Sequence, residues 1–314
     1  MLVLRSSPVL LGVLLAALAL DGAIAAQEPT HSVFRAGVDR VPVATVVRTR
    51  KGQPVTNLTR DDFLLFDNGK RREITDFQSD PTPVSLLLLV DLSGSMALEG
   101  RWDATQEVAG QLELFLKPGQ DEVGLYAFDK HLQELEPFGS PLGDVAYHLK
   151  TLRPFGMTSL YDAIAEAGRV MGTRPGTRRA IVAVTDGEDN ASRLTAPEVS
   201  AMASSIDVPV YIVMVASDDP EQPVAPGATP EAQARGRLAD LAHWTGGELF
   251  RPRNPIEDRR AAGQIVEELR QQYLIVFAPE TEPGWHSIVI QTRAKDLVVR
   301  ARNGYLVGGR SGPN

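Results

Sequence analysis

The middle of the chain alternates between wholly apolar runs and stretches in which apolar and polar residues recur at helical spacing. Residues 86–90 and 181–184 are apolar at every position. A strand without a polar face must be covered on both sides, which is typical of a parallel sheet between helices. The expected strands are 85–90, 122–128, 132–137, 180–185, 208–215 and 248–250. The expected helices are 102–117, 142–152, 159–172, 196–205, 231–244 and 256–271. The short link at 129–131 predicts that one strand of this α/β sheet runs antiparallel.

Both flanks of this region have a β pattern. Residues 41–47 are β-branched and partly alternating, and Asn68-Gly69 favours a tight hairpin turn. Strands are expected again at 273–277, 287–291 and 297–302. Neither flank has enough strands for a stable sheet alone. We therefore predict that segments 32–82 and 273–307 pair into a small β-sandwich-like domain. The α/β domain, residues 84–272, is inserted between them, and 308–314 form a tail.

The N-terminus has the pattern of a secretory signal peptide. Arg5 precedes an apolar run at 8–20, and small residues follow up to Ala26. The run is shorter than the ~20 residues of a spanning helix, and no later segment is long and apolar enough to span a membrane. We predict that residues 1–25 are removed and that the protein is exported, to the periplasm or the medium.

Composition narrows the classes of partner and chemistry. The chain has 32 Lys and Arg against 40 Asp and Glu, a net charge of −8, which argues against nucleic acid or an anionic membrane as the main partner. Cysteine is absent, so disulfides, thiolate zinc sites and cysteine nucleophiles are excluded. The five histidines are scattered and give no support to a histidine metal site.

Oxygen-bearing side chains follow two of the predicted strands. In an open α/β sheet, binding groups gather at the carboxyl ends of the strands. Hydroxyls and carboxylates without nitrogen or sulfur suit a hard cation such as Mg²⁺, Mn²⁺ or Ca²⁺. Thr158 lies in the loop before the helix expected at 159–172, which reaches the same edge of the sheet. The candidate metal-site residues are therefore Asp91, Ser93, Ser95, Thr158 and Asp186.

Three segments resemble the signature of a von Willebrand factor type A (VWA) domain with a metal-ion-dependent adhesion site. They are D-L-S-G-S at 91–95, G-M-T-S-L-Y-D-A-I at 156–164 and V-T-D-G-E-D at 184–189. The mature chain also resembles secreted A-domain proteins of the acidobacterial type, through G-Q-P-V-T-N-L-T-R-D-D-F at 52–63 and R-N-G-Y at 302–305. Met157 departs from the pattern, because relatives often have a second glycine there.

The resemblance implies roles for the candidate residues. Ser93, Ser95 and Thr158 would bind the metal directly, and Asp91 and Asp186 would act mainly through water. The fold implied is a mostly parallel, Rossmann-like sheet between helices. The function implied is an exported, noncatalytic adhesion module that captures an Asp or Glu of a partner protein through the cation. The alternative is a scaffold subunit of an envelope or secreted assembly with a purely structural metal.

Several enzyme classes are excluded because the sequence lacks residues that their motifs require. An aspartyl phosphotransferase needs a second acid two positions after Asp91, where Ser93 stands. The glycine pattern of a serine hydrolase, the glycine-rich turn of a dinucleotide-binding domain and the phosphate-binding G-K-S/T are absent from the sequence.

The sequence leaves the role of two groups of residues open. Residues 48–51 either hold an acidic partner or form a solvated hairpin tip, and Met96 and Trp102 either form an apolar collar at the metal or pack under the first helix.

Overall fold

A computed structural model describes residues 40–307 except 140–142, 144, 177, 206 and 216–229. The predicted signal peptide at 1–25 and the tail at 308–314 lie outside the described residues. None of the helices described has the length and apolarity that crossing a membrane requires.

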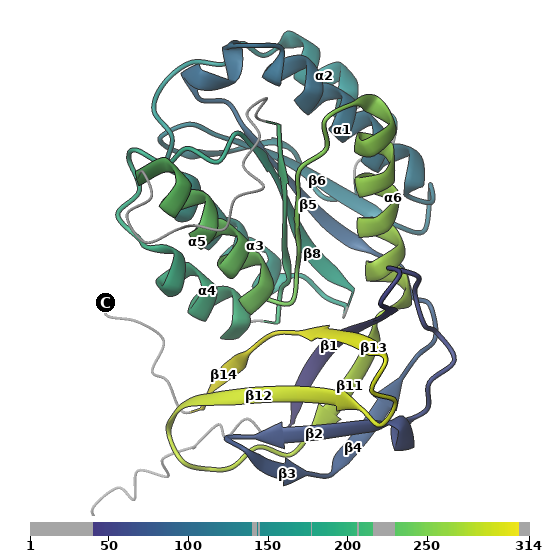
Figure 1. The fold of residues 1–314 in the computed structure, drawn as a ribbon. Coiled ribbons are helices and arrows are strands. Elements are labelled where there is room, and N and C mark those ends of the chain that lie inside the picture. The colour runs from purple at the N-terminus through teal and green to yellow at the C-terminus, as the bar shows by residue number, and fades with distance from the viewer. Residues whose placement is uncertain are drawn as a thin grey trace, which may run out of the picture. The chain divides into compact units, whose positions relative to one another are not determined.

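A six-stranded sheet forms the centre of the α/β domain, with the strand order β10-β9-β8-β5-β6-β7 (Figure 1). Its strands are β5 (Ser85–Asp91), β6 (Glu122–Phe128), β7 (Leu132–Glu136), β8 (Arg179–Thr185), β9 (Val210–Met214) and β10 (Leu249–Phe250). All neighbours are parallel except β6 and β7, which pair as an antiparallel hairpin. The predicted α/β fold class, with its mostly parallel sheet, is confirmed.

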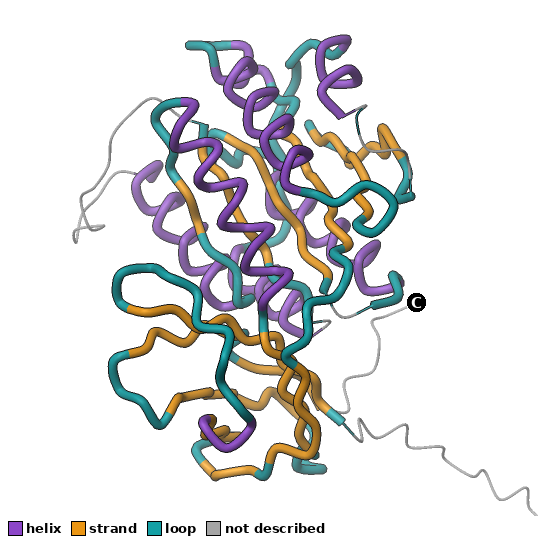
Figure 2. Tube along the Cα trace, turned by 90° about the vertical axis from the view of Figure 1, so that its right-hand side faces the viewer, coloured by secondary structure: helices purple, strands orange, loops and turns teal. Residues whose placement is uncertain are grey.

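Helices cover both faces of this sheet (Figures 1 and 2). One face is covered by α1 (Arg101–Phe115), α2 (Val145–Thr151) and α6 (Pro255–Gln271), and the other by α3 (Leu160–Thr173), α4 (Ala196–Ser205) and α5 (Pro230–Trp244). Leu86 and Leu88 pack into the first core, whereas Leu87 and Leu89 pack into the second. Alternate side chains of a strand point to opposite faces, so β5 needs an apolar residue at every position from 86 to 90, where helices cover both faces.

The last helix of the α/β domain has a well-formed start. Asn254 is extended, and its side-chain oxygen accepts hydrogen bonds from the backbone N–H groups of Ile256 and Glu257 at 3.1 and 3.0 Å. Pro255 occupies the first turn, where its missing N–H costs nothing. The helix therefore begins one residue before the predicted position and ends at Gln271, with only Gln272 between it and β11.

The two flanks form two four-stranded sheets around a common core, in the orders β13-β1-β11-β4 and β14-β12-β2-β3. Their strands are β1 (Val41–Thr49), β2 (Phe63–Asp67), β3 (Lys70–Arg72), β4 (Ile74–Gln78), β11 (Tyr273–Phe277), β12 (Gly284–Thr292), β13 (Leu297–Ala301) and β14 (Gly304–Val307), with a short 3-10 helix at Arg60–Asp62. Because β1 pairs with β11 and β13, and β2 with β12, each sheet needs strands from both flanks. The predicted β-sandwich-like pairing is confirmed.

Of the short strands β3, β4 and β14, the sequence pattern predicted only β3, as the return strand of the hairpin at Asn68-Gly69, and this hairpin is confirmed. Each is short, and β3 consists of charged residues alone. Pairing across the sheet places them: β3 pairs with β2, β4 with β11, and β14 with β12. The same pairing with β14 extends β12 back to Gly284, three residues before the predicted start.

Buried hydrogen bonds join the β-sandwich to the α/β domain. Arg302, only 4% exposed, donates to the carbonyl oxygens of Ser204 in α4 and Pro42 in β1. The backbone N–H of Asn303 donates to the carbonyl of Trp244 at 2.9 Å. Arg178, 2% exposed, donates to the Thr82 hydroxyl at 3.1 Å, at the first crossing between the two domains.

Candidate metal site

The five candidate residues come from three loops at the carboxyl edge of the parallel sheet. Asp91 is the last residue of β5, and Ser93 and Ser95 follow it, Ser95 within a short 3-10 helix at Gly94–Ala97. Asp186 follows β8, the strand that pairs with β5. Thr158 lies two residues before the start of α3.

Asp91 is fully buried and already bound by protein groups. Its Oδ1 accepts from the backbone N–H of Ser93 at 2.9 Å, and its Oδ2 accepts from the hydroxyl of Thr185 at 2.6 Å. The pKa of the carboxyl is raised to about 7, mainly by burial and to a lesser extent by the charge of Asp186, although its hydrogen bonds to Ser93 and Thr185 act in the opposite direction. A positive charge at this edge would favour the ionised form of Asp91.

Backbone contacts bring the serine turn to the threonine loop. The hydroxyl oxygens of Ser93 and Ser95 lie 3.2 Å apart. The N–H of Gly94 donates to the carbonyl of Gly156 at 3.0 Å, and a side chain at Gly94 would come within 3.3 Å of that oxygen. Gly156 has a φ of +108°, which disfavours any other residue. Glycine is therefore strongly favoured at 156, and a side chain at 94 would require the threonine loop to shift.

Thr158 is held through its backbone. Its N–H donates to the side-chain oxygen of Asn190 at 3.0 Å, and its carbonyl accepts from the N–H groups of Asn190 and Ala191. Asp162, one turn into α3, accepts from the N–H groups of Arg193 and Leu194, so it holds the adjacent loop. These bonds tie the threonine loop to the segment after β8.

Asp186 has a partner that sequence reasoning missed. Arg101, at the start of α1, places Nη1 2.8 Å from Asp186 Oδ2 and 3.4 Å from the carbonyl oxygen of Ser95. The other carboxylate oxygen accepts from the N–H of Glu188 at 3.1 Å. Arg101 therefore bridges the loops that carry Ser95 and Asp186.

The donor chemistry of this edge fits a hard cation. Asp91, Ser93, Thr158 and Asp186 are each no more than 2% exposed, and Ser95 is half-buried. Two carboxylates and three hydroxyls thus lie at one edge of the sheet with little access to bulk water. Such a group is costly to bury unless its oxygens are paired or coordinate a metal ion. Among the described residues no cluster of three or more His, Asp or Glu forms a metal site, so the hydroxyls are essential to this candidate.

Exposed apolar side chains flank the candidate metal site. Phe155 is 82% exposed and Met157 50%, on either side of Gly156, and Leu98 is 57% exposed just after the serine turn. The N–H of Phe155 donates to the carbonyl of Leu92 at 2.8 Å, which holds this loop against the end of β5. Phe155, Met157 and Leu98 are called the apolar rim below.

The side chains of Met96 and Trp102 do not form that rim. Met96 is 0% exposed, and Trp102 packs against the core under α1. Of the two alternatives for these residues, an apolar collar at the metal or packing under the first helix, the structure shows the packing. The sequence does not indicate that Phe155 and Met157 are exposed, because isolated apolar residues of a loop can also be buried in a core.

Comparison with known proteins bears on the fold of this domain. Residues 86–188 match the family model of the von Willebrand factor type A domain. The central unit is a VWA domain. Proteins of this domain class are generally noncatalytic interaction modules, which indicates a protein partner. No match was found among curated proteins.

One solved structure supports the fold at low sequence identity. A von Willebrand factor type A protein from Catenulispora acidiphila is 13% identical, with a TM-score of 0.50; the match covers 76% of this chain and 71% of that one. An aerotolerance-related membrane protein from Bacteroides fragilis is 21% identical with a TM-score of 0.48, covering 59% of this chain and 99% of that one. The protein BatB from Bacteroides thetaiotaomicron is 19% identical with a TM-score of 0.48, covering 59% and 98%.

Proposed function

We propose that the VWA domain binds a divalent cation, Mg²⁺ in the first place, and uses it to capture an acidic residue of a partner protein. Ser93, Ser95 and Thr158 would hold the cation directly, and Asp91 and Asp186 would act mainly through water. The protein would work as an exported, noncatalytic adhesion module. The cation, when bound, supplies an electron-poor centre for the partner's carboxylate.

The observation that carries this proposal is the buried set of oxygens at the carboxyl edge of the sheet. Three of the oxygens are neutral hydroxyls, which leave a bound cation with much of its charge uncompensated. An incoming carboxylate then gains a strong charge-assisted interaction. Asp91 is oriented by the Ser93 N–H and the Thr185 hydroxyl, so its carboxylate does not need to reorganise.

The apolar rim suggests what surrounds the partner's acidic residue. Phe155 and Met157 lie next to Gly156, whose carbonyl is bonded to Gly94 in the middle of the serine turn. These exposed side chains are therefore available to contact a partner that brings a carboxylate to the serines. Burial of a Phe or Met side chain contributes about 1.5–3 kcal/mol. The proposed ligand is thus an Asp or Glu beside an apolar residue, on the surface of another protein.

Calorimetric titration with Mg²⁺, Mn²⁺ and Ca²⁺ tests the cation part of the proposal. The wild-type protein should bind at least one of these ions, and Ser93→Ala/Ser95→Ala should lose that binding with its circular dichroism unchanged. A matched control is Thr75→Ala/Ser287→Ala, which removes two exposed hydroxyls from the β-sandwich. Undiminished binding by the serine double variant would refute the assignment of the ligands.

Partner capture separates adhesion from the scaffold alternative. The tagged protein is incubated with an envelope extract or culture medium of the source organism, with Mg²⁺ or with EDTA. Adhesion through the cation predicts partners that are retained with Mg²⁺, released by EDTA and lost in Ser93→Ala/Ser95→Ala. Partners retained equally in EDTA would favour a scaffold whose metal is purely structural.

A further inference from the structure

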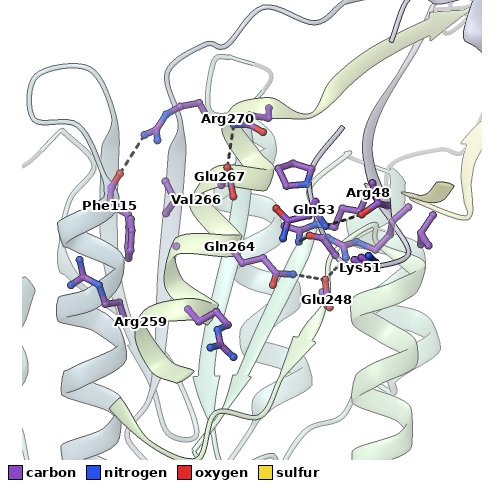
Figure 3. A pocket seen from close by; sticks show the side chains of 18 of the residues that line it. Arg48, Lys51, Gln53, Phe115, Glu248, Arg259, Gln264, Val266, Glu267 and Arg270 are labelled. Carbon is purple, nitrogen blue, oxygen red and sulfur yellow. Dashed lines mark hydrogen bonds and ion pairs between the residues drawn. The ribbon is translucent and has the colours of Figure 1, made fainter. Parts of the chain in front are cut away.

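A second candidate surface lies away from the metal site, along the outer face of α6. It is a groove of about 1050 Å³ between α6, the end of α1 and the turn that follows β1. Figure 3 shows Arg48, Lys51 and Gln53 of that turn on one side of α6, and Phe115 and Arg259 on the other. This volume is at the upper end of the roughly 300–1,000 Å³ of small-molecule pockets, so the α6 groove suits a larger ligand.

The turn that carries one wall of the α6 groove is held by its own hydrogen bonds. The N–H of Thr49 donates to the carbonyl of Gln53 at 2.8 Å, and Arg48 Nη1 donates to the carbonyl of Gly52 at 2.5 Å. Gly52 has a φ of +79°, which allows the tight return. Arg50 and Lys51 stand exposed at the tip of this fixed turn.

Three arginines of the groove are neutralised by buried or half-buried carboxylates. Arg48 Nε lies 2.8 Å from Glu268 Oε1, and Arg300 pairs with both Glu268 and Glu248. Arg270 pairs with the buried Asp121. These arginines hold the β-sandwich and α1 against α6, and their charge is already compensated.

Four other cations of the groove, Arg50, Lys51, Arg259 and Arg260, have no acidic partner among the residues that the structure describes. Within the described ranges no ion pair involves Arg50, Lys51 or Arg260. Arg259 has only neutral contacts: its guanidinium donates to the side-chain oxygen of Gln111 at 3.3 Å and lies over the ring of Phe115. The groove thus concentrates uncompensated positive charge on a chain whose net charge is −8.

Apolar side chains are interspersed with these charges. Ile256 is 73% exposed and Val298 53% exposed, and the ring of Phe115 lies over Gly263, where a side chain would collide with it at 2.9 Å. A flat lipid surface could not follow such a concave groove. Glu267 is also exposed in the groove, so a ligand must place an uncharged group beside it, whereas a phosphate backbone carries a charge at every unit. An extended peptide can place separate carboxylates on the cations and apolar side chains between them.

We propose that the α6 groove binds an acidic segment of a partner protein, independently of the metal site. Arg50 and Lys51 from the turn, with Arg259 and Arg260 from α6, supply the charge that attracts the segment. Planar guanidinium groups can bind carboxylates with two parallel hydrogen bonds, which adds specificity to the attraction. Among residues 48–51, Arg48 is structural because it pairs with Glu268, and the proposal takes the partner-binding alternative for the exposed Arg50 and Lys51.

Fluorescence anisotropy with a labelled hexapeptide of alternating Glu and Leu tests this site on the full mature chain. Measurements are made with EDTA at about 20 mM and about 300 mM NaCl, because screening weakens exposed charge pairs. The wild type should bind at low salt and weaken strongly at high salt. Lys51→Glu/Arg260→Glu should lose at least about tenfold in affinity. The matched control Lys150→Glu/Arg169→Glu reverses two exposed cations outside the groove and should bind like the wild type.

A metal-site variant and two other classes of ligand are measured in the same assay. Ser93→Ala/Ser95→Ala should bind the peptide normally, so failure of the metal site and failure of the groove are distinguishable. Absence of wild-type binding at low salt, or equal loss in the groove variant and its control, would overturn the proposal. It would also be overturned if phosphatidylserine vesicles or single-stranded DNA bound the groove more tightly than the peptide, because the ligand would then belong to another class.

Discussion

The guanidinium of Arg101 lies 2.8 Å from the carboxylate of Asp186, and both side chains are largely buried. Arg101 comes from the start of α1 and Asp186 from the end of β8, and 85 residues separate them in the chain. A fixed positive charge thus lies beside the acidic part of the candidate metal site. It compensates one carboxylate and would repel a cation nearby.

Removal of this charge is expected to strengthen cation binding. In Arg101→Gln the carboxylate of Asp186 is still held by the N–H of Glu188 at 3.1 Å, whereas the repulsion is gone. We expect the affinity for Mg²⁺ to rise by about tenfold, an effect of order 1.4 kcal/mol. Calorimetry measures it, with Arg169→Gln as a control at an exposed arginine. Weaker Mg²⁺ binding in Arg101→Gln would mean that Arg101 mainly positions Asp186.

The buried Glu268 is expected to be a major contributor to the free energy of unfolding. It is 2% exposed, pairs with Arg48 and Arg300 and accepts a hydrogen bond from Tyr211 at 3.0 Å. Loss of one partner in a buried ion pair costs roughly 3–5 kcal/mol. Glu268→Gln should therefore lower the free energy of unfolding by about 3 kcal/mol in urea titrations.

The exposed pair Arg169–Glu166 is the control for that measurement. Glu166→Gln should change the free energy of unfolding by less than about 0.5 kcal/mol, because exposed pairs contribute little. A similar small effect in Glu268→Gln would show that the buried ion pairs do not hold the β-sandwich against α6.

The apolar rim is expected to matter for binding and not for folding. Phe155 is 82% exposed, so Phe155→Ala should leave the free energy of unfolding within about 0.5 kcal/mol of the wild type and Mg²⁺ affinity unchanged. A partner captured in Mg²⁺ should bind at least about tenfold more weakly, because burial of the ring is lost. Surface plasmon resonance against that partner measures the effect. Unchanged affinity would remove the rim from the proposed interface.

Asp258 predicts a pH dependence of stability. The residue is 6% exposed, and burial, with the nearby charges of Glu107 and Glu257, raises its pKa to about 6. Between about pH 4 and pH 6 the folded state then holds a proton that the unfolded state has released. The contribution of Asp258 to the free energy of unfolding is therefore largest below about pH 4 and falls as the pH rises through 6.

The variant Asp258→Asn isolates this effect from other carboxyls. It should be more stable than the wild type at pH 7, by of order 1 kcal/mol. The difference between the two proteins should shrink as the pH is lowered from 7 to about 4. Urea titrations at several pH values measure it, and a difference that does not vary with pH would contradict the raised pKa.

The apolar pattern along the chain was enough to predict the architecture. Residues 86–90 are apolar at every position, and only a strand covered on both faces can bury them all. The same logic places Asp91 and Asp186 at neighbouring strand ends, because groups that follow parallel strands lie at one edge of a sheet. The local pattern thus determined the layers, the paired β flanks and the candidate metal site, which stays a prediction.

Tertiary structure alone decided which charged and exposed side chains meet. Nothing near Arg101 in the sequence indicates that it pairs with Asp186, and nothing near Arg48 indicates that Glu268 neutralises it while Arg50 and Lys51 stay exposed. Hydrophobic periodicity predicts which face of an element is buried, because the spacing of apolar residues within that element alone determines which face is apolar. The partner of a side chain depends on the register and packing of distant elements, and these form only when the whole chain folds.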